Sequence, residues 1–284
     1  MQRRLIFVTG KGGVGKSTVA LALGLRAAQL GKRTIVADLH TGGDASENEF
    51  ASGLFRTSID PQLAMEEYLT VKVGGAAGQL LSQSRLFAAL AMATPGMREL
   101  LSLGKVWELA QTNRRTPGAE PYDLTIVDAP ASGHGLALLR TPRTFAEIAR
   151  VGPIANQADT IARTLADRAF TAYVAVAIPE ELAVTETLEL DEALQRERLN
   201  LDLVVLNQCH PDRFDEGDRA VFGPLAEIPH VALALAADAR AQAERAQAAR
   251  LRERFAERLL ELPFLFDAAI ERPQLEQLGQ ELAP

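Results

Sequence analysis

A glycine-rich loop near the start of the chain constrains the fold more than any other stretch. It reads Gly10-Lys11-Gly12-Gly13-Val14-Gly15-Lys16-Ser17. The apolar residues 5–8 before it favour a short buried strand, and residues 17–25 after it favour an apolar helix. A strand, a glycine-rich loop and a helix in this order form a phosphate-binding loop, in which backbone N–H groups and a helix N-terminus face the phosphates. The stretch therefore predicts a nucleotide site.

Each residue type in this loop has a chemical role. Glycines keep Cβ atoms away from the phosphates. Lys16 is predicted to reach the β- and γ-phosphates, and the Ser17 hydroxyl is predicted to bind Mg²⁺. The predicted nucleotide-binding set is Gly10, Gly12, Gly13, Val14, Gly15, Lys16, Ser17 and Thr18. A flexible loop with a solvated lysine is the alternative, and the flanking strand and helix argue against it.

Two further predicted strands each end in an aspartate. Residues 32–37 lead into Asp38, and residues 121–127 lead into Asp128. A carboxylate at this edge of a nucleotide-binding sheet lies near the phosphates. Asp38 is therefore predicted to orient a water or to hold Mg²⁺ through water, and Asp128 to bind Mg²⁺ partly through water. In each case a capping role in a loop is the alternative.

Three segments around these strands have other predicted roles. The polar residues 39–49 are a candidate switch loop. The Pro- and Gly-containing residues 129–135 are a loop predicted to respond to loss of the γ-phosphate. Within it, His134 either senses the phosphate or makes a backbone hydrogen bond.

A helical subdomain is predicted to be inserted in the sheet. Apolar residues recur at helical spacing between residues 60 and 113, with a glycine-rich break at residues 74–78. Residues 142–170 are predicted to complete this subdomain. Its apolar side chains Met65, Met92, Met97 and Trp107 either line a groove for an apolar partner or, the favoured interpretation, pack between helices.

The rest of the chain returns to alternating strands and helices. Strands are predicted at 172–178 and 201–206, a helix at 181–198, a polar loop with at most a short helix at 210–227, and a long helix at 236–260. The long helix has an apolar strip of Leu251, Phe255 and Leu259, which favours docking on its own sheet over binding to a membrane surface. The predicted fold is a doubly wound, mostly parallel α/β sheet in one domain, 1–284.

Composition limits the possible partners. The formal net charge of −7 argues against a broad nucleic-acid surface. One cysteine, Cys209, excludes a disulfide within the chain and suits a reducing compartment. Because the chain has no apolar run long enough to span a bilayer, we expect a cytoplasmic protein without stable membrane insertion.

These motifs together resemble a known family. The glycine-rich loop, with its additional Lys11, resembles the deviant Walker A motif of dimeric P-loop ATPases. The string Asp128-Ala129-Pro130-Ala131-Ser132-Gly133-His134-Gly135 resembles switch II of the arsenite-pump and tail-anchored-protein-targeting branch. Residues 94–100, 138–142 and 204–208 agree with the same branch.

The resemblance implies roles for particular residues. Lys11 is expected to reach the partner's phosphates across a dimer interface, and Asp38 to orient the attacking water. Asn207 is expected to recognise adenine, and residues 271–282 to form a closing helix. Pro263 and Phe264 are expected to form a loop over the base. The alternatives are that Asn207 is only a strand-end turn residue and Pro263 an ordinary loop proline. The implied cofactors are ATP and Mg²⁺. The implied partners are a second copy or a paralogue, and either a hydrophobic protein client or a membrane transporter.

The chain also departs from the family. Asp38 is followed by Leu39-His40-Thr41-Gly42-Gly43, whereas the family has Asp-Pro-Ala-His. Cys209 alone supplies neither the several thiolates that bind arsenite nor the two cysteines per chain of a zinc-bridged dimer, so arsenite activation is not expected. A partition or positioning ATPase and a non-hydrolysing nucleotide-binding scaffold remain alternatives.

Overall fold

The computed structural model describes residues 3–39, 43–72, 89, 92–116, 118–149 and 152–282. The predicted break at 74–78 lies outside the described residues, as do three residues of the candidate switch loop, 40–42.

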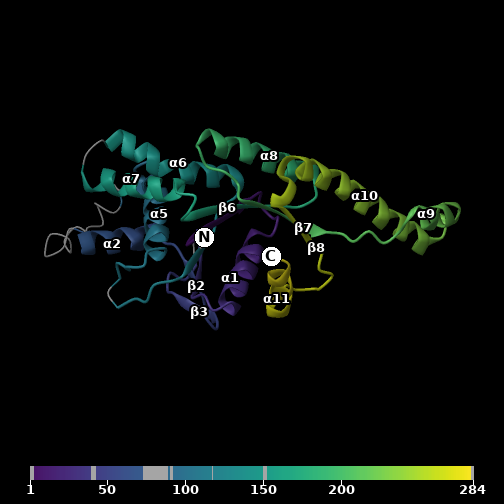
Figure 1. The fold of residues 1–284 in the computed structure, drawn as a ribbon, viewed down its shortest axis with the longest axis horizontal. Helices are drawn as coiled ribbons and strands as arrows, with labels where there is room; N and C mark the ends of the chain where they lie inside the picture. Colours follow the sequence, from purple (N-terminus) through teal and green to yellow (C-terminus); the bar gives the residue numbers. More distant parts are fainter. Residues whose placement is uncertain are drawn as a thin grey trace.

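One eight-stranded sheet forms the centre of the molecule, in the order β3-β4-β2-β5-β1-β6-β7-β8 (Figure 1). The strands are β1 (Leu5–Gly10), β2 (Thr34–Asp38), β3 (Asn48–Ala51), β4 (Leu54–Ser58), β5 (Leu124–Asp128), β6 (Thr171–Ala177), β7 (Leu203–Cys209) and β8 (Leu259–Pro263). Every neighbouring pair is parallel except β3 and β4. The predicted doubly wound, mostly parallel α/β fold is confirmed.

Helices cover both faces of the sheet (Figure 1). Side chains of α1 (Lys16–Gln29) and α11 (Arg272–Glu281) pack on one face. The other face is covered by α5 (Met97–Leu109), α6 (Ser132–Ala149), α7 (Pro153–Ala166), α8 (Glu181–Arg196) and part of α10 (Pro229–Phe255). α2 (Pro61–Lys72) packs on α5, and α11 is the predicted closing helix.

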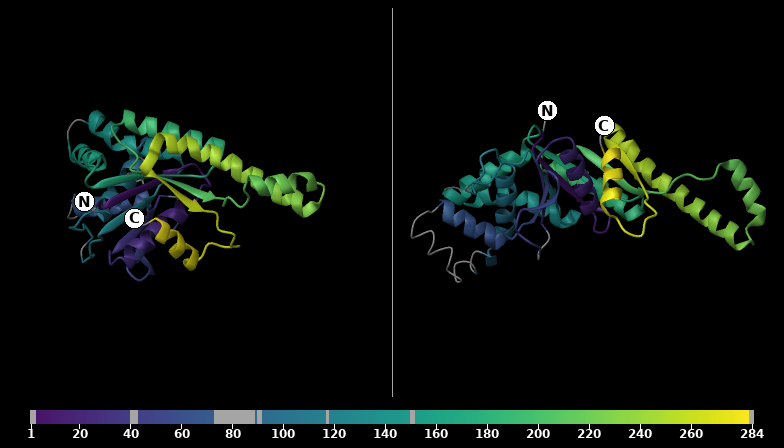
Figure 2. Two further views of the ribbon diagram at one scale, coloured as in Figure 1. Left: turned by 45° about the vertical axis from the view of Figure 1, so that its right-hand side comes forward. Right: turned by 90° about the horizontal axis from the view of Figure 1, so that it is seen from below.

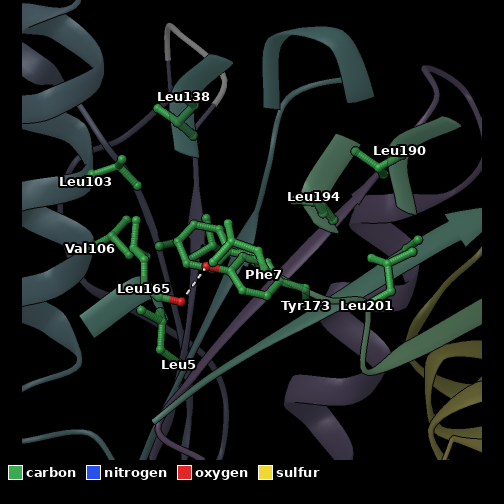
Figure 3. Close-up of a cluster of buried hydrophobic side chains, with 14 of the residues drawn as sticks. Leu5, Phe7, Leu103, Val106, Leu138, Leu165, Tyr173, Leu190, Leu194 and Leu201 are labelled. Atoms are coloured by element: carbon green, nitrogen blue, oxygen red, sulfur yellow. Dashed lines mark hydrogen bonds between the residues drawn. The ribbon is translucent and has the colours of Figure 1, made fainter. Parts of the chain in front are cut away.

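The alternation of side chains along β1 explains why both faces are apolar. Leu5 and Phe7 enter one core and Ile6 and Val8 the other, because successive side chains of a strand point to opposite faces. The Phe7 ring stacks on that of Tyr173 with centroids 5.6 Å apart, and the Tyr173 hydroxyl donates to the carbonyl of Leu165 at 2.8 Å (Figure 3). The sheet is thus fixed against α7.

The predicted helical region is partly confirmed. Residues 60–113 contain α2 and α5 and no strand among the described residues. The second part of the helical subdomain was predicted at 142–170, but helix α6 already begins at Ser132, so the prediction of a loop over 129–135 is wrong from that residue on. Gly135 packs closely there, since a Cβ would lie 3.1 Å from Thr9 Oγ1 and 3.2 Å from the carbonyl oxygen of Pro130. The boundaries 60–113 and 142–170 stay a prediction.

Sequence reasoning missed or misplaced four strands. The hairpin of β3 and β4 was not expected, and β3 begins inside the predicted loop 39–49. The strand predicted at 201–206 is β7, which continues to Cys209. β8 occupies residues that were assigned to the end of the long helix and to the loop after it.

The long helix is α10, which begins seven residues earlier than predicted, at Pro229 rather than residue 236. It ends where Ala256 adopts a φ of 47°, in the left-handed region that stops a helix. Leu251 and Phe255 are buried against the sheet as expected, but Leu259 lies in β8. The first part of α10, together with α9 (Glu216–Phe222) and the short helix η1 (Gly223–Leu225), projects from the body (Figure 2). A second short helix, η2 (Ala256–Arg258), leads into β8.

Candidate nucleotide-binding site

The carboxyl ends of the central strands bring the two predicted aspartates together. Asp38 at the end of β2 is directly opposite Asp128 at the end of β5, and Asp128 is opposite Val8 of β1. β1 continues by two residues into Gly10, where the glycine-rich loop begins. The loop and both carboxylates therefore share one edge of the sheet, as the sequence predicted.

Two glycines of the loop are required by close contacts. Gly10 has a φ of 141°, and a Cβ there would lie 2.1 Å from the carbonyl oxygen of Val176. Gly15 has a φ of 91°, and a Cβ would lie 2.4 Å from Nδ2 of Asn207. Gly12 and Gly13, by contrast, are exposed and face open space among the described residues. A phosphate can approach this part of the loop closely.

Lys16 and Ser17 are the first two residues of helix α1 and lie beside Asp128. The Lys16 ammonium donates to the carbonyl of Lys11 at 3.0 Å. Burial lowers the pKa of Lys16, and the Asp128 carboxylate partly offsets this effect. The Ser17 hydroxyl donates to Asp128 Oδ2 at 2.5 Å. This serine and aspartate provide oxygen atoms at one point, which is the chemistry that Mg²⁺ prefers, so the residues present fit the ion.

The residues predicted to hold the base lie on β7 and β8. Asn207 is buried, and its Nδ2 donates to the carbonyl of Val14 at 2.9 Å, so it contacts the glycine-rich loop. Pro263 is exposed at the end of β8. The backbone N–H of Phe264 donates to the carbonyl of Cys209 at 2.9 Å, and its ring stacks on that of His210 with centroids 4.3 Å apart. The two strand ends are thereby joined beside the loop.

Lys11 forms an ion pair with a residue of its own chain. Its Nζ is 3.6 Å from Oε1 of Glu186 in α8, and both side chains are roughly 30% exposed. Glu186 Oε2 accepts from the Ser132 hydroxyl at 3.1 Å, which links the loop to the start of α6. Sequence reasoning missed Glu186, because nothing in its local pattern distinguishes it from other helix glutamates.

Backbone contacts hold the predicted switch segments. The Leu39 N–H donates to the carbonyl of Asp128 at 3.2 Å, and the Ile59 N–H donates to the carbonyl of Asp38 at 2.8 Å. His134 is exposed in the first turn of α6, and its backbone N–H donates to the carbonyl of Ala131 at 2.9 Å. The phosphate-sensing role of its ring stays a prediction.

An apolar cavity of about 100 Å³ lies among α2, α5 and α7. Met65 and Met97 line it, whereas Met92 borders a different pocket. The Trp107 indole donates to the Thr164 hydroxyl of α7 at 3.0 Å and packs against the core. Of the four predicted groove residues, two therefore line this cavity.

The fold and this edge define a P-loop nucleotide-binding protein. A family model described as anion-transporting ATPase matches residues 3–152 and 146–223, and the chain belongs to this family of ATPases. The resemblance to the arsenite-pump and tail-anchored-protein-targeting ATPases is confirmed at the level of the family.

Several curated proteins are similar to this chain. ATPase BagA of Mycobacterium tuberculosis is 30% identical over 238 residues, which cover 76% of this chain and 68% of BagA. ATPase GET3 of Kluyveromyces lactis is 28% identical over 261 residues, covering 76% of this chain and 74% of GET3. ATPase GET3A of Arabidopsis thaliana is 26% identical over 256 residues, covering 74% and 68%. In the described part of the chain, no helix has the length and apolar character needed to cross a bilayer.

Proposed function

We propose that this chain is a Mg²⁺-dependent ATPase whose turnover requires two chains to close around the bound nucleotide. The observation that supports it best is the pairing of the Ser17 hydroxyl with the Asp128 carboxylate beneath the glycine-rich loop. Members of the family are ATPases, and this pairing puts the expected oxygen atoms at the start of α1.

Different residues of the chain have different proposed roles in hydrolysis. Backbone N–H groups of residues 10–18 bind the phosphates, and Lys16 neutralises charge on the β- and γ-oxygens. Ser17 and Asp128 would hold Mg²⁺, which would supply further neutralisation of the developing charge. Asp38, one strand away, orients the attacking water. Asn207 and the loop with Pro263 and Phe264 hold the adenine.

Lys11 is the residue that makes turnover depend on a second chain. Its contact with Glu186 spans 3.6 Å between two partly exposed side chains, and such pairs add little stability. Lys11 can therefore leave Glu186 at small cost when the partner's phosphates approach. We assign the partner as a second copy, with a paralogous chain as the outcome if the pure protein does not turn over.

The client is proposed to be a hydrophobic protein segment that binds at the apolar cavity among α2, α5 and α7. Coupling to a membrane transporter is the second possibility for the same helices. Arsenite does not fit as an activator, because burial raises the pKa of the lone Cys209 to about 12 and keeps its thiol protonated.

The test is steady-state ATP hydrolysis at increasing protein concentration. The native chain is compared with Lys11→Ala, Lys16→Ala and, as a control away from the loop, Lys32→Ala. We expect specific activity to rise with concentration, to be lost in the first two variants and to persist in the control.

Each other result selects a different function. Activity that is independent of concentration and survives Lys11→Ala overturns the role of the second chain. A native protein that binds ATP but never hydrolyses it, alone or with a cell extract that supplies a paralogue, is a non-hydrolysing scaffold. Salt-sensitive DNA binding in the presence of ATP supports the partition ATPase instead.

A further inference from the structure

Five charged side chains of alternating sign form a continuous network away from the nucleotide site. They are Glu47, Arg114, Glu108, Lys105 and Glu67. Arg114 contacts Glu47 through Nη2 at 2.6 Å and Glu108 through Nε at 2.8 Å. Lys105 Nζ is 3.0 Å from Glu108 and 2.7 Å from Glu67. The network spans from the segment before β3 to helices α5 and α2.

Hydrogen bonds connect one end of the network to the sheet edge at which Asp38 lies. Glu47 follows Asp44 and Ala45, whose carbonyls accept from the Ser58 N–H at 2.8 Å and the Thr57 hydroxyl at 3.0 Å. Ile59, the residue directly after β4, donates its N–H to the carbonyl of Asp38. The end of β4 therefore holds both the segment of Glu47 and the strand end of Asp38.

The other end of the network reaches the apolar cavity. Glu67 and Lys105 are both among the residues that line it, from α2 and α5 respectively. Glu67 of α2 contacts Lys105 of α5, so the position of the Lys105 side chain depends on the distance between the two helices. Anything that separates these helices must also disturb the contact of Lys105 with Glu108.

The centre of the network is buried, so the loss of one charged side chain there destabilises its partner. The Arg114 and Glu108 side chains are each only 1% exposed. Charges removed from water in this way depend on their partners, and removing one partner leaves an unpaired buried charge. Burial disfavours ionised Glu47, but hydrogen bonds from Arg114 and from the Tyr122 hydroxyl outweigh it and keep the pKa of Glu47 below its ordinary value. The network therefore tends to move as one unit.

We propose that Glu47 and Arg114 are positioning residues that couple the strand end of Asp38 to the apolar cavity between α2 and α5. A nucleotide-dependent shift of the segment of Glu47 pulls on Arg114 and, through Glu108 and Lys105, changes the spacing of the two helices. Occupation of the cavity acts back on Asp38 along the same contacts, since coupling between two sites is reciprocal. The inference rests on the proposed function for the role of Asp38.

Trp107 provides a readout that does not require turnover. It is the only tryptophan of the chain, lies on α5 and is hydrogen-bonded to α7. Its fluorescence therefore reports on the helices around the cavity. The experiment titrates the full-length chain with a non-hydrolysable ATP analogue and Mg²⁺ while recording Trp107 emission, and measures analogue affinity separately with a fluorescent nucleotide.

The variants are Glu47→Gln, which removes the charge but keeps an acceptor, and Tyr122→Phe, which removes one donor and keeps the ring. Glu49→Gln is the matched control, since Glu49 is an exposed glutamate of β3 that bonds to the Gly53 N–H. We expect saturable emission changes in the native chain and the control. In Glu47→Gln we expect the change to fall at least about fivefold, with analogue affinity changed less than about twofold.

The turnover readout separates positioning from a structural role. We expect Glu47→Gln to lower kcat with KM nearly unchanged, and Tyr122→Phe to do so more weakly. A variant that only loses stability lowers the melting temperature but keeps the full emission change per bound nucleotide, and that result overturns the inference. So does a native chain that binds the analogue with no change in Trp107 emission, while the proposed ATPase stands. A chain that does not bind the analogue overturns both.

Discussion

Neutralising Glu186 tests the proposed trans role of Lys11 directly. In the single chain, Lys11 is held by Glu186 of α8, and it has to leave this carboxylate before it can reach a partner's phosphate. Glu186→Gln removes the attraction, while the glutamine side chain keeps an acceptor for the Ser132 hydroxyl. The substitution should therefore favour the closed dimer rather than damage it.

The size of the effect follows from the geometry. The pair spans 3.6 Å, and the two side chains are 28% and 30% exposed, so its contribution is at most about 1 kcal/mol. Dimer closure breaks one such pair in each chain, which gives at most about 2 kcal/mol, or roughly a 30-fold lower dissociation constant for the variant. The difference should shrink in high salt, because exposed charges are screened.

The assay is the concentration of protein that gives half-maximal specific ATPase activity, together with sedimentation velocity in a non-hydrolysable ATP analogue. Glu189→Gln, an exposed glutamate on the same helix, is the control and should leave this concentration unchanged. A half-maximal concentration that is the same for Glu186→Gln and the native chain, at low salt, refutes the idea that this contact competes with the dimer.

Three other perturbations have clear expected outcomes. Gly10→Ala should destabilise the fold by more than about 3 kcal/mol in urea unfolding, because the new Cβ would lie 2.1 Å from the backbone oxygen of Val176. Asp128→Asn should lower kcat by about 100-fold or more while ADP binding persists, which isothermal titration would show. The lowered pKa values of Glu47 and Glu108 should contribute stability that is present above the ordinary value of 4.5 and is lost as pH falls through the depressed values. Urea unfolding followed by circular dichroism at a series of pH values should therefore show a larger loss of unfolding free energy on acidification for the native chain than for Glu47→Gln, in which the linkage of Glu47 is removed.

Local patterns were enough to predict that the glycine-rich loop and the two aspartates meet at one edge of the sheet. The strand, loop and helix around Gly10 are contiguous, and their glycine spacing follows from the approach of the phosphates. Asp38 and Asp128 each follow a buried apolar strand, and parallel pairing of β2 with β5 brings the two strand ends to one level. Asn207 and Phe264 were assigned by family resemblance; in the structure Asn207 contacts the loop through Val14, and Phe264 is bonded to the end of β7 at Cys209.

Contacts between distant residues could not be predicted in this way. Arg114 and Glu47 are 67 positions apart, and neither lies in a pattern that indicates a buried pair. The β3–β4 hairpin was missed because β3 is short and polar and its exposed side chains resemble a loop. β8 was assigned to the preceding helix because Leu259 continues the spacing of Leu251 and Phe255, and only pairing with β7 decides between the two structures.

The contacts at the sheet edge bear on the proposed coupling, because the residues directly after Asp38 depart from the family pattern. Three predicted catalytic residues have contacts that lead to different helices: Lys11 contacts Glu186 of α8, Asp128 contacts Ser17 of α1, and Asp38 accepts from Ile59, two residues before α2. Of these, only α2 borders the apolar cavity. The contacts that lead there involve residues 44–47 and 57–60, which lie beyond the residues that depart from the family after Asp38. Substitutions in residues 39–43 should therefore alter the rate of hydrolysis more than the response of the cavity to nucleotide.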